Sequence, residues 1–365
     1  MSRFLNNGLS FLMHKRGSRM LSSSSSSSGP FLRLGSMVKE EEEEDVLDDV
    51  LLFDAAKEEL LTVPDKPHPH ELADTTVVAS SLGWGFFSGF SDRSLYISDH
   101  LNPLSSSSKV IPLPPLTALS SCQTDVFCNV AMSSSSPSDD DPDLVVAVKF
   151  LGRQLSLCRP NRDLRWTNIA TPFPFLERSN LMYSNRDRKF YLPLPGSTYL
   201  CSWDLHFTPS FRKFMYTNRP KLSQSEHQLL DSCSRADYWV ESPSGERFLV
   251  KCYTNDTLER DPVFMVFREE GMTDMCYTED IGDLCIFISE SDPFCVLAGS
   301  CPGLVPNSIY LTESVFGVYH LPTKSLRHFE EKPFLGKAEV QPSLGKAEVQ
   351  PILPHWLPPS CSHLL

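Results

Sequence analysis

The chain has 365 residues, enough for one large or two ordinary domains, and its 33 Lys and Arg face 46 Asp and Glu, for a net charge of −13. This acidic balance argues against broad nucleic-acid binding, which needs clustered Lys and Arg to displace counterions from phosphates. No apolar run approaches the roughly 20 residues of a membrane-spanning helix. Pro is common (29) and Gly is ordinary (17), as in a turn-rich all-β domain.

The first 36 residues are basic and contain no acid. They hold five Lys and Arg, seven consecutive serines at 22–28 and no Asp or Glu, whereas residues 37–45 hold five Glu and one Asp. A basic, Ser-rich start that turns abruptly acidic predicts an organelle transit peptide over residues 1–36, followed by an acidic spacer over 37–47. Without residues 1–36, 28 Lys and Arg remain against 46 Asp and Glu, so the mature chain carries about −18.

Short strand-like segments dominate the rest of the chain. Residues 46–61 fit either an amphipathic helix or a strand–turn–strand unit by periodicity alone. Ser242–Gly245 predicts a hairpin turn, because Pro243 presets φ and Gly245 accepts a positive φ. One helix is expected at Ser223–Cys233, with Ser223 as N-cap and Glu226 three residues later. Further strands are predicted at 94–98, 109–113, 143–150, 155–158, 180–183, 189–192, 199–203, 238–241, 247–253, 262–268, 283–289, 294–298, 308–312 and 315–320.

Strands at such regular spacing indicate a sandwich, a barrel or a propeller. The series runs over residues 48–330, which is too long for a sandwich and fits an all-β propeller of about six or seven four-stranded blades. Residues 331–365 form a Pro-rich, low-complexity tail. In this tail Leu335–Pro342 recurs as Leu344–Pro351, a duplication at nine-residue spacing, and two copies are too few for a solenoid.

Motifs for catalysis, cofactors or metals are scarce. The sequence has no Gly-rich phosphate loop and no G-x-S-x-G, so we expect no enzyme, no cofactor and no metal site. The pair His68 and His70 is interpreted as a solvated loop, and the acidic runs 40–45 and 139–143 as solvated charge. Eleven cysteines without a C-x-x-C predict buried free thiols, with a redox pair or a metal site as alternatives.

Three residues are candidates for recognition or for a structural motif. Trp84 lies between Gly83 and Gly85, so it either packs between blades or takes part in recognition. Asp280 and Asp283 bracket Gly282 ahead of an apolar strand. They either accept backbone N–H groups in a turn between strands or contact a ligand.

Several segments resemble the plant KIB-type β-propeller family, formerly described as domain of unknown function 295. The most specific are Cys276–Ser289 (CYTEDIGDLCIFIS) and Cys301–Tyr310 (CPGLVPNSIY). Arg235–Tyr253, Pro262–Arg268 and Asp163–Thr167 agree as well. The resemblance covers residues 48–330, implies the propeller fold, and favours strand–turn–strand over a helix at 46–61.

Many members of this family carry an N-terminal F-box and are similar to substrate receptors of ubiquitin ligases. This sequence has no room for the roughly 45 helical residues of an F-box between the spacer and the first strands, so it resembles the organelle-targeted branch that lacks one. Its Arg content and Phe- and Leu-rich start favour the mitochondrion over the chloroplast.

The resulting hypothesis is a non-enzymatic protein-binding propeller in mitochondria. Its partners would be an unidentified protein and the import machinery, without nucleic acid and without a membrane span. An F-box-like adaptor in the cytosol or nucleus and an enzyme that uses the propeller channel are the alternatives.

Overall fold

A computed structural model gives the fold. It describes residues 19–20, 29–40, 46–103, 105, 108–119, 122, 124, 127–135, 137, 143–175, 179–194, 196, 198–255, 261–271, 273–289, 291–312, 315–329, 349–350 and 354–359. Most of residues 1–36, most of both acidic runs and nearly all of the duplicated tail segment therefore lie outside the described residues.

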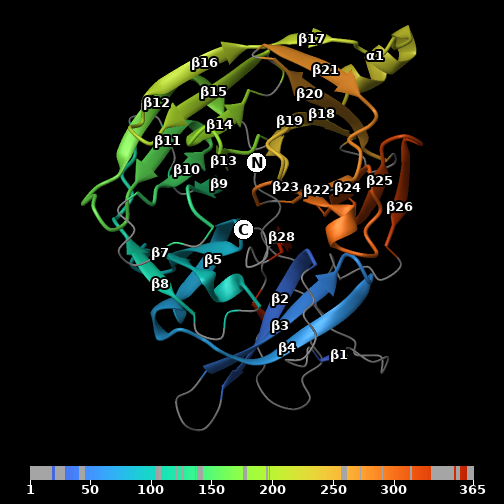
Figure 1. Cartoon of the computed structure of the whole chain (residues 1–365). Coiled ribbons are helices and arrows are strands. Elements are labelled where there is room, and N and C mark those ends of the chain that lie inside the picture. Colours follow the sequence, from blue (N-terminus) through green and yellow to red (C-terminus); the bar gives the residue numbers. More distant parts are fainter. Residues whose placement is uncertain are drawn as a thin grey trace.

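Within the described residues, six sheets are arranged in a ring, the architecture of a six-bladed β-propeller (Figure 1). Blade 1 consists of β1 (Arg19–Met20), β4 (Glu59–Pro67), β3 (Val46–Asp54), β2 (Phe31–Glu40), β27 (Val349–Gln350) and β28 (His355–Leu357). Blade 2 consists of β5 (Thr75–Ser81), β6 (Trp84–Gly89), β7 (Leu95–Ser98) and β8 (Val110–Leu113). Blade 3 consists of β9 (Phe127–Met132), β10 (Val146–Phe150), β11 (Gly152–Cys158) and β12 (Thr167–Phe175).

The other three blades continue around the ring. Blade 4 consists of β13 (Met182–Ser184), β14 (Lys189–Pro193), β15 (Tyr199–Asp204) and β16 (Pro209–Lys213). Blade 5 consists of β18 (Ser234–Glu241), β19 (Arg247–Thr254), β20 (Val263–Glu270), β21 (Asp274–Thr278) and β17 (Met215–Thr217). Blade 6 consists of β23 (Phe294–Leu297), β22 (Leu284–Ile288), β24 (Ser308–Leu311), β25 (Gly317–His320) and β26 (Ser325–His328).

The described helices are short. They are the 3₁₀ turns η1 (His70–Leu72), η2 (Asp99–Leu101) and η3 (Ala298–Ser300), and the helix α1 (Gln224–Asp231). In the described part of the chain, no helix has the length and apolar character needed to cross a membrane. The capping box predicted for α1 is present, because the Ser223 hydroxyl accepts from the Glu226 N–H while Ser223 N–H donates to the Glu226 carboxylate.

The hydrophobic cores lie between neighbouring blades. Successive side chains of a strand point to opposite faces of a sheet, and both faces of a blade are covered by the blades beside it. Accordingly, Tyr238 of β18 packs in a cluster that includes Ile286 of blade 6, whereas the adjacent Trp239 packs with Tyr191 of blade 4. Central strands are therefore apolar on both faces, and every residue of Leu284–Ile288 is buried.

The ring is closed by a strand from near the C-terminus. Strand β28 pairs antiparallel with β2, with Leu32 opposite Trp356. The Trp356 ring is 1% exposed and contacts Phe287 of blade 6, so one residue of the C-terminal segment seals the junction of blades 1 and 6. Both β2 and β28 lie outside the range 48–330 predicted for the propeller.

The blade number, the hairpin and the helix agree with the sequence analysis. The strand–turn–strand unit is confirmed as β3, a turn at 55–58 and β4. The sequence analysis did not predict strands β1, β2, β5, β6, β9, β12, β16, β17, β21, β26, β27 and β28.

Candidate functional site

Trp84 lies on β6, the second strand of blade 2, and its side chain is 6% exposed. The ring packs among the apolar residues between blades 2 and 3, and its Nε1 donates to the Ser135 carbonyl oxygen at 3.2 Å. A Cβ on the adjacent Gly85 would lie 2.8 Å from the Leu101 side chain, so this glycine permits close approach. Trp84 therefore has a packing role, and recognition by it stays a prediction.

Asp280 and Asp283 accept hydrogen bonds from the backbone. Asp280 Oδ1 accepts from the Gly282 N–H at 2.8 Å, and Gly282 has φ +68°. Asp283 Oδ2 accepts from the Gly299 N–H at 3.1 Å. Both carboxylates thus stabilise the turns beside β22, and contact of either with a ligand stays a prediction.

Exposed apolar side chains gather where blade 4 passes into blade 5. Tyr199, Phe211 and Met215 are 40%, 49% and 59% exposed. Tyr199 faces Lys213 across β15 and β16, and Lys213 Nζ lies 6.0 Å from the centre of its ring. Residues 207–225 contain four Lys and Arg and no acid, in a chain of net charge −13. We name Tyr199, Phe211, Lys213 and Met215 the basic apolar surface.

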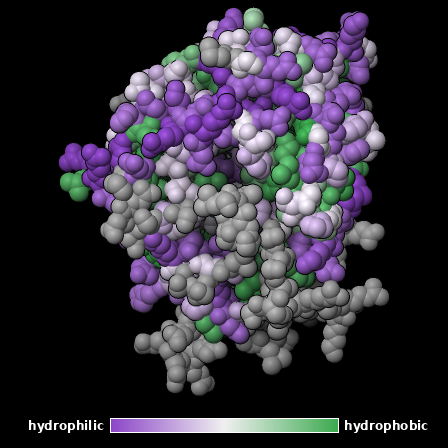
Figure 2. Space-filling view, in the orientation of Figure 1, coloured by the Kyte–Doolittle hydropathy of each residue, from purple (hydrophilic) through white to green (hydrophobic). Residues whose placement is uncertain are grey.

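A loop between β22 and β23 connects the inner strands of the other blades. This axial loop, Ser289, Ser291 and Asp292, is reached from blades 1 to 4. The Ser81 hydroxyl of β5 donates a short hydrogen bond to Asp292, and Asn129 Nδ2 of β9 lies 3.4 Å from Asp292 Oδ1. Burial raises the pKa of Asp292 to about 8, so the carboxyl is mostly protonated at neutral pH. In Figure 2, hydrophilic residues predominate on the upper blades around a central hollow.

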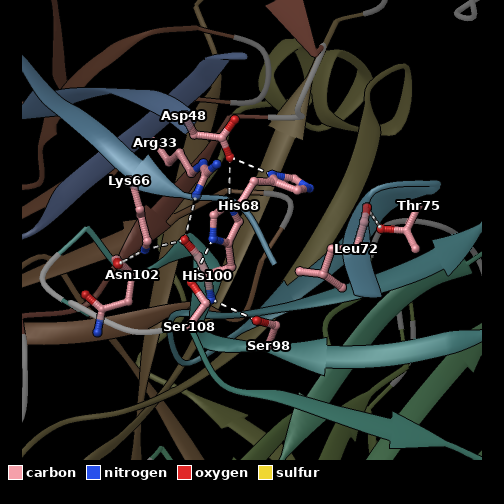
Figure 3. A network of polar contacts seen from close by, with 10 residues as sticks. All are labelled: Arg33, Asp48, Lys66, His68, Leu72, Thr75, Ser98, His100, Asn102 and Ser108. Carbon is pink, nitrogen blue, oxygen red and sulfur yellow. Dashed lines mark hydrogen bonds and ion pairs between the residues drawn. The ribbon is translucent and has the colours of Figure 1, made fainter. Parts of the chain in front are cut away.

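A second polar network joins blades 1 and 2 (Figure 3). Asp48 Oδ2 of β3 lies 2.8 Å from Nδ1 of His68, which follows β4, and 2.8 Å from Nε2 of His100, which lies in η2. These three residues, named the Asp48–His68–His100 cluster, are the one group of metal-binding residue types found within the described residues. Lys66 Nζ donates to the carbonyl oxygens of His100 and Asn102, both at 2.5 Å.

Local structure positions the members of this cluster. A β-bulge in β3, between Asp48 and Val50, changes the direction of the strand next to the carboxylate. His68 lies between two prolines, which fix φ on both sides. Ser98 caps η2 by accepting from the His100 N–H at 3.1 Å.

Burial and hydrogen bonds determine the charges in the cluster. Burial alone would raise the pKa of Asp48, but the hydrogen bonds from His100 and His68 outweigh it and lower the pKa well below its usual range. Burial lowers the pKa of His100 to about 4 and that of Lys66 to about 7. At neutral pH the network therefore holds an ionised Asp48 and a neutral His100, with Arg33 charged because its pKa is lowered by burial only to about 10.

The sequence interpretation of His68 and His70 as a solvated loop is wrong for His68. The His68 side chain is 8% exposed and bonded to Asp48, whereas His70 is exposed. His68 contacts Asp48 and His100, which lie 20 and 32 positions away in the sequence. A spacing motif within one segment cannot reveal contacts over such separations.

The prediction of buried free thiols agrees with six of the nine cysteines in the described residues, whereas Cys122, Cys233 and Cys276 are free but only partly buried. Cys158, Cys201 and Cys285 are buried free cysteines. Burial raises the pKa of each of these thiols to about 12, which keeps them protonated and unreactive.

The ring of sheets, the cores between blades and the closing strand define the protein as a six-bladed β-propeller. The family model for the KIB1-4 β-propeller matches residues 52–330. The chain belongs to this family. Among curated proteins, no sequence matches it.

The chain shows only remote likeness to solved structures. A member of the duf4221 family from Bacteroides vulgatus is 11% identical with a TM-score of 0.37, over 67% of this chain and 80% of that one. Virginiamycin B lyase from Staphylococcus aureus is 7% identical with a TM-score of 0.35, over 82% and 86%. Streptogramin B lyase is 9% identical with a TM-score of 0.32, over 67% and 83%. At this level of likeness these structures say nothing about activity.

Proposed function

We propose that this chain is a non-enzymatic propeller that binds an acidic protein partner inside mitochondria. The basic apolar surface is the observation that carries the proposal. Tyr, Phe and Met are enriched at the centre of protein interfaces, and Lys213 adds a positive charge beside these exposed side chains. The partner we expect presents apolar residues with Asp and Glu around them, because opposite charges steer association.

The position of this surface on strands supports the proposal. Phe211 and Lys213 of β16 are held by pairing with β15, and Met215 of β17 by pairing with β21. A backbone that is held in paired strands loses little conformational freedom on binding, which favours affinity.

Affinity purification of the tagged full chain from mitochondrial extract tests the surface. Phe211→Ser combined with Met215→Ser removes its apolar centre, whereas Leu164→Ser removes a side chain that is 92% exposed elsewhere and serves as the matched control. We expect at least one acidic protein to co-purify with wild type and the control but not with the double variant. Equal recovery of every partner by the double variant would refute this surface.

The subcellular localisation is tested separately with fluorescent proteins fused to the C-terminus. Strand β2 begins at Phe31, and its residues pair with β28, so a presequence that leaves this pairing in place would end before that residue. The informative comparison is therefore the full chain against deletions of residues 1–28 and 1–36. We expect mitochondrial signal that both deletions abolish. Cytosolic or nuclear signal for all three fusions would reject mitochondrial import and favour the adaptor alternative.

A further inference from the structure

The Asp48–His68–His100 cluster combines two imidazole nitrogens and one carboxylate with no thiolate. This donor set suits first-row divalent transition ions and excludes magnesium and calcium sites, which are built from oxygen ligands alone. The ligand atoms lie within 4.8 Å of one another, and the side chains of Asp48 and His100 are 1% and 2% exposed. The residues come from two blades, so an ion here would link blade 1 to blade 2.

The distances between the donor atoms are close to those of a tetrahedral site. Asp48 Oδ2 lies 2.8 Å from one nitrogen of each histidine. Zinc bonds of about 2.0–2.1 Å imply about 3.3 Å between neighbouring ligands, so the donors would have to separate by roughly 0.5 Å. Rotation of the side chains can provide this separation.

An independent observation is the second oxygen of Asp48. Within the described residues, Asp48 Oδ1 is buried and accepts no hydrogen bond. A buried carboxylate oxygen without a partner is costly, and metal coordination would satisfy it. Both histidines approach the other oxygen, Oδ2, so an ion would satisfy Oδ1 by binding both carboxylate oxygens of Asp48.

His100 also has the outer hydrogen bond that is common for metal-bound histidines. Its Nδ1 lies 2.9 Å from Ser108 Oγ. A hydroxyl can donate or accept, so with the ion absent Nε2–H donates to Asp48, and with the ion present Nδ1–H donates to Ser108 while Nε2 binds the ion. This exchange of tautomers requires no charged imidazole.

Two basic groups nearby limit the affinity, Arg33, which is charged at neutral pH, and Lys66, which is partly charged because burial lowers its pKa to about 7. Arg33 and Lys66 both direct their donors at the His100 carbonyl oxygen, on the backbone side of that residue, and not at the imidazole nitrogens. They repel any added cation through space. We therefore expect binding weaker than in structural zinc sites, with a Kd of about 1–10 µM.

We propose that Asp48, His68 and His100 form a binding site for a first-row divalent transition ion, with zinc as the reference, at the junction of blades 1 and 2. Titration of the chelator-treated full chain with Co²⁺ tests the site, because the visible spectrum reports ligand number and thiolates add a separate near-ultraviolet band. We expect one equivalent of N- and O-ligated Co²⁺ that Zn²⁺ displaces.

Variants locate the binding. His68→Gln should weaken Co²⁺ binding by about 100-fold and Ser108→Ala by about 10-fold to 100-fold, whereas His70→Gln, two residues from His68 and exposed, should leave it unchanged. His68 is the least buried ligand, so this variant should fold, which far-ultraviolet circular dichroism checks. A thiolate band as the only signal, unchanged affinity of His68→Gln, or no saturable binding to wild type would each overturn the proposal.

Discussion

The buried carboxyl of Asp292 predicts a particular pH dependence of stability. Its pKa is raised by burial from an ordinary 3.8 to about 8 in the folded chain. Because the folded state holds a proton that the unfolded state has released, the free energy of unfolding falls as pH rises between about 4 and 8, by about 1.4 kcal/mol per pH unit. Below about pH 4 both states are protonated, so this contribution to stability is fully present there.

Asp292→Asn removes the titrating group while keeping its shape. Other groups also titrate over this range, so the informative quantity is the difference in the free energy of unfolding between the variant and wild type. From about pH 5.5 to about pH 8 this difference should shift by about 3 kcal/mol in favour of the variant. Near the folded-state pKa of about 8, the Asp292 carboxyl is partly ionised in the folded state as well. The difference in the free energy of unfolding therefore changes there by less than the limiting slope of roughly 1.4 kcal/mol per pH unit.

Urea unfolding followed by tryptophan fluorescence at both pH values measures this difference. Asp92→Asn is the matched control, because backbone hydrogen bonds lower the pKa of Asp92, and a carboxyl of lowered pKa is ionised in both states over this range. Its difference from wild type should not change with pH. If the Asp292→Asn difference were equally constant, Asp292 would ionise like an exposed carboxyl, and the reasoning from burial would be refuted.

Two further predictions concern ring closure. Gly303 has φ +110°, and an added Cβ would lie 2.1 Å from the Ala56 carbonyl oxygen, so Gly303→Ala should destabilise by about 2–4 kcal/mol. Gly271→Ala is the control, because Gly271 also has a positive φ (+71°) but an added Cβ would meet nothing within 4 Å, so it should cost about 1 kcal/mol. The melting temperatures of the two variants measure the difference. Equal melting temperatures for Gly303→Ala and Gly271→Ala would contradict a clash with Ala56. Trp356→Ala should cost about 3–5 kcal/mol in urea unfolding, and a cost as small as that of Leu164→Ala would show that the C-terminal strand does not seal the ring.

Local sequence signals predicted those parts of the fold that depend on neighbours in the chain. The Ser242–Gly245 turn forms because Gly245 adopts φ +85°, and α1 begins at its capping box because both partners lie within one turn. The apolar strand Leu284–Ile288 could be recognised since both of its faces are buried.

Long-range pairings could not be predicted in the same way. Residues 31–36 have the composition of a presequence, and their pairing with β3 and with residues 355–357 places them in a blade. Asp292 lies in a Ser-rich turn whose residues look solvated, and its burial follows from side chains on two other blades. Asp48, His68 and His100 come from three separate segments, so no spacing motif joins them.

The pairing of β2 with β28 has a consequence for the timing of folding. The end of β2 at Glu40 and the start of β28 at His355 are 315 residues apart, so at about 5–20 residues per second a ribosome needs roughly 15–60 s to supply the second strand after the first. During that interval blade 1 has an unpaired edge, and blades 1 and 6 lack the tryptophan between them. The ring cannot close until β28 has been synthesised. Until then the incompletely folded chain remains accessible to chaperones and competent for translocation.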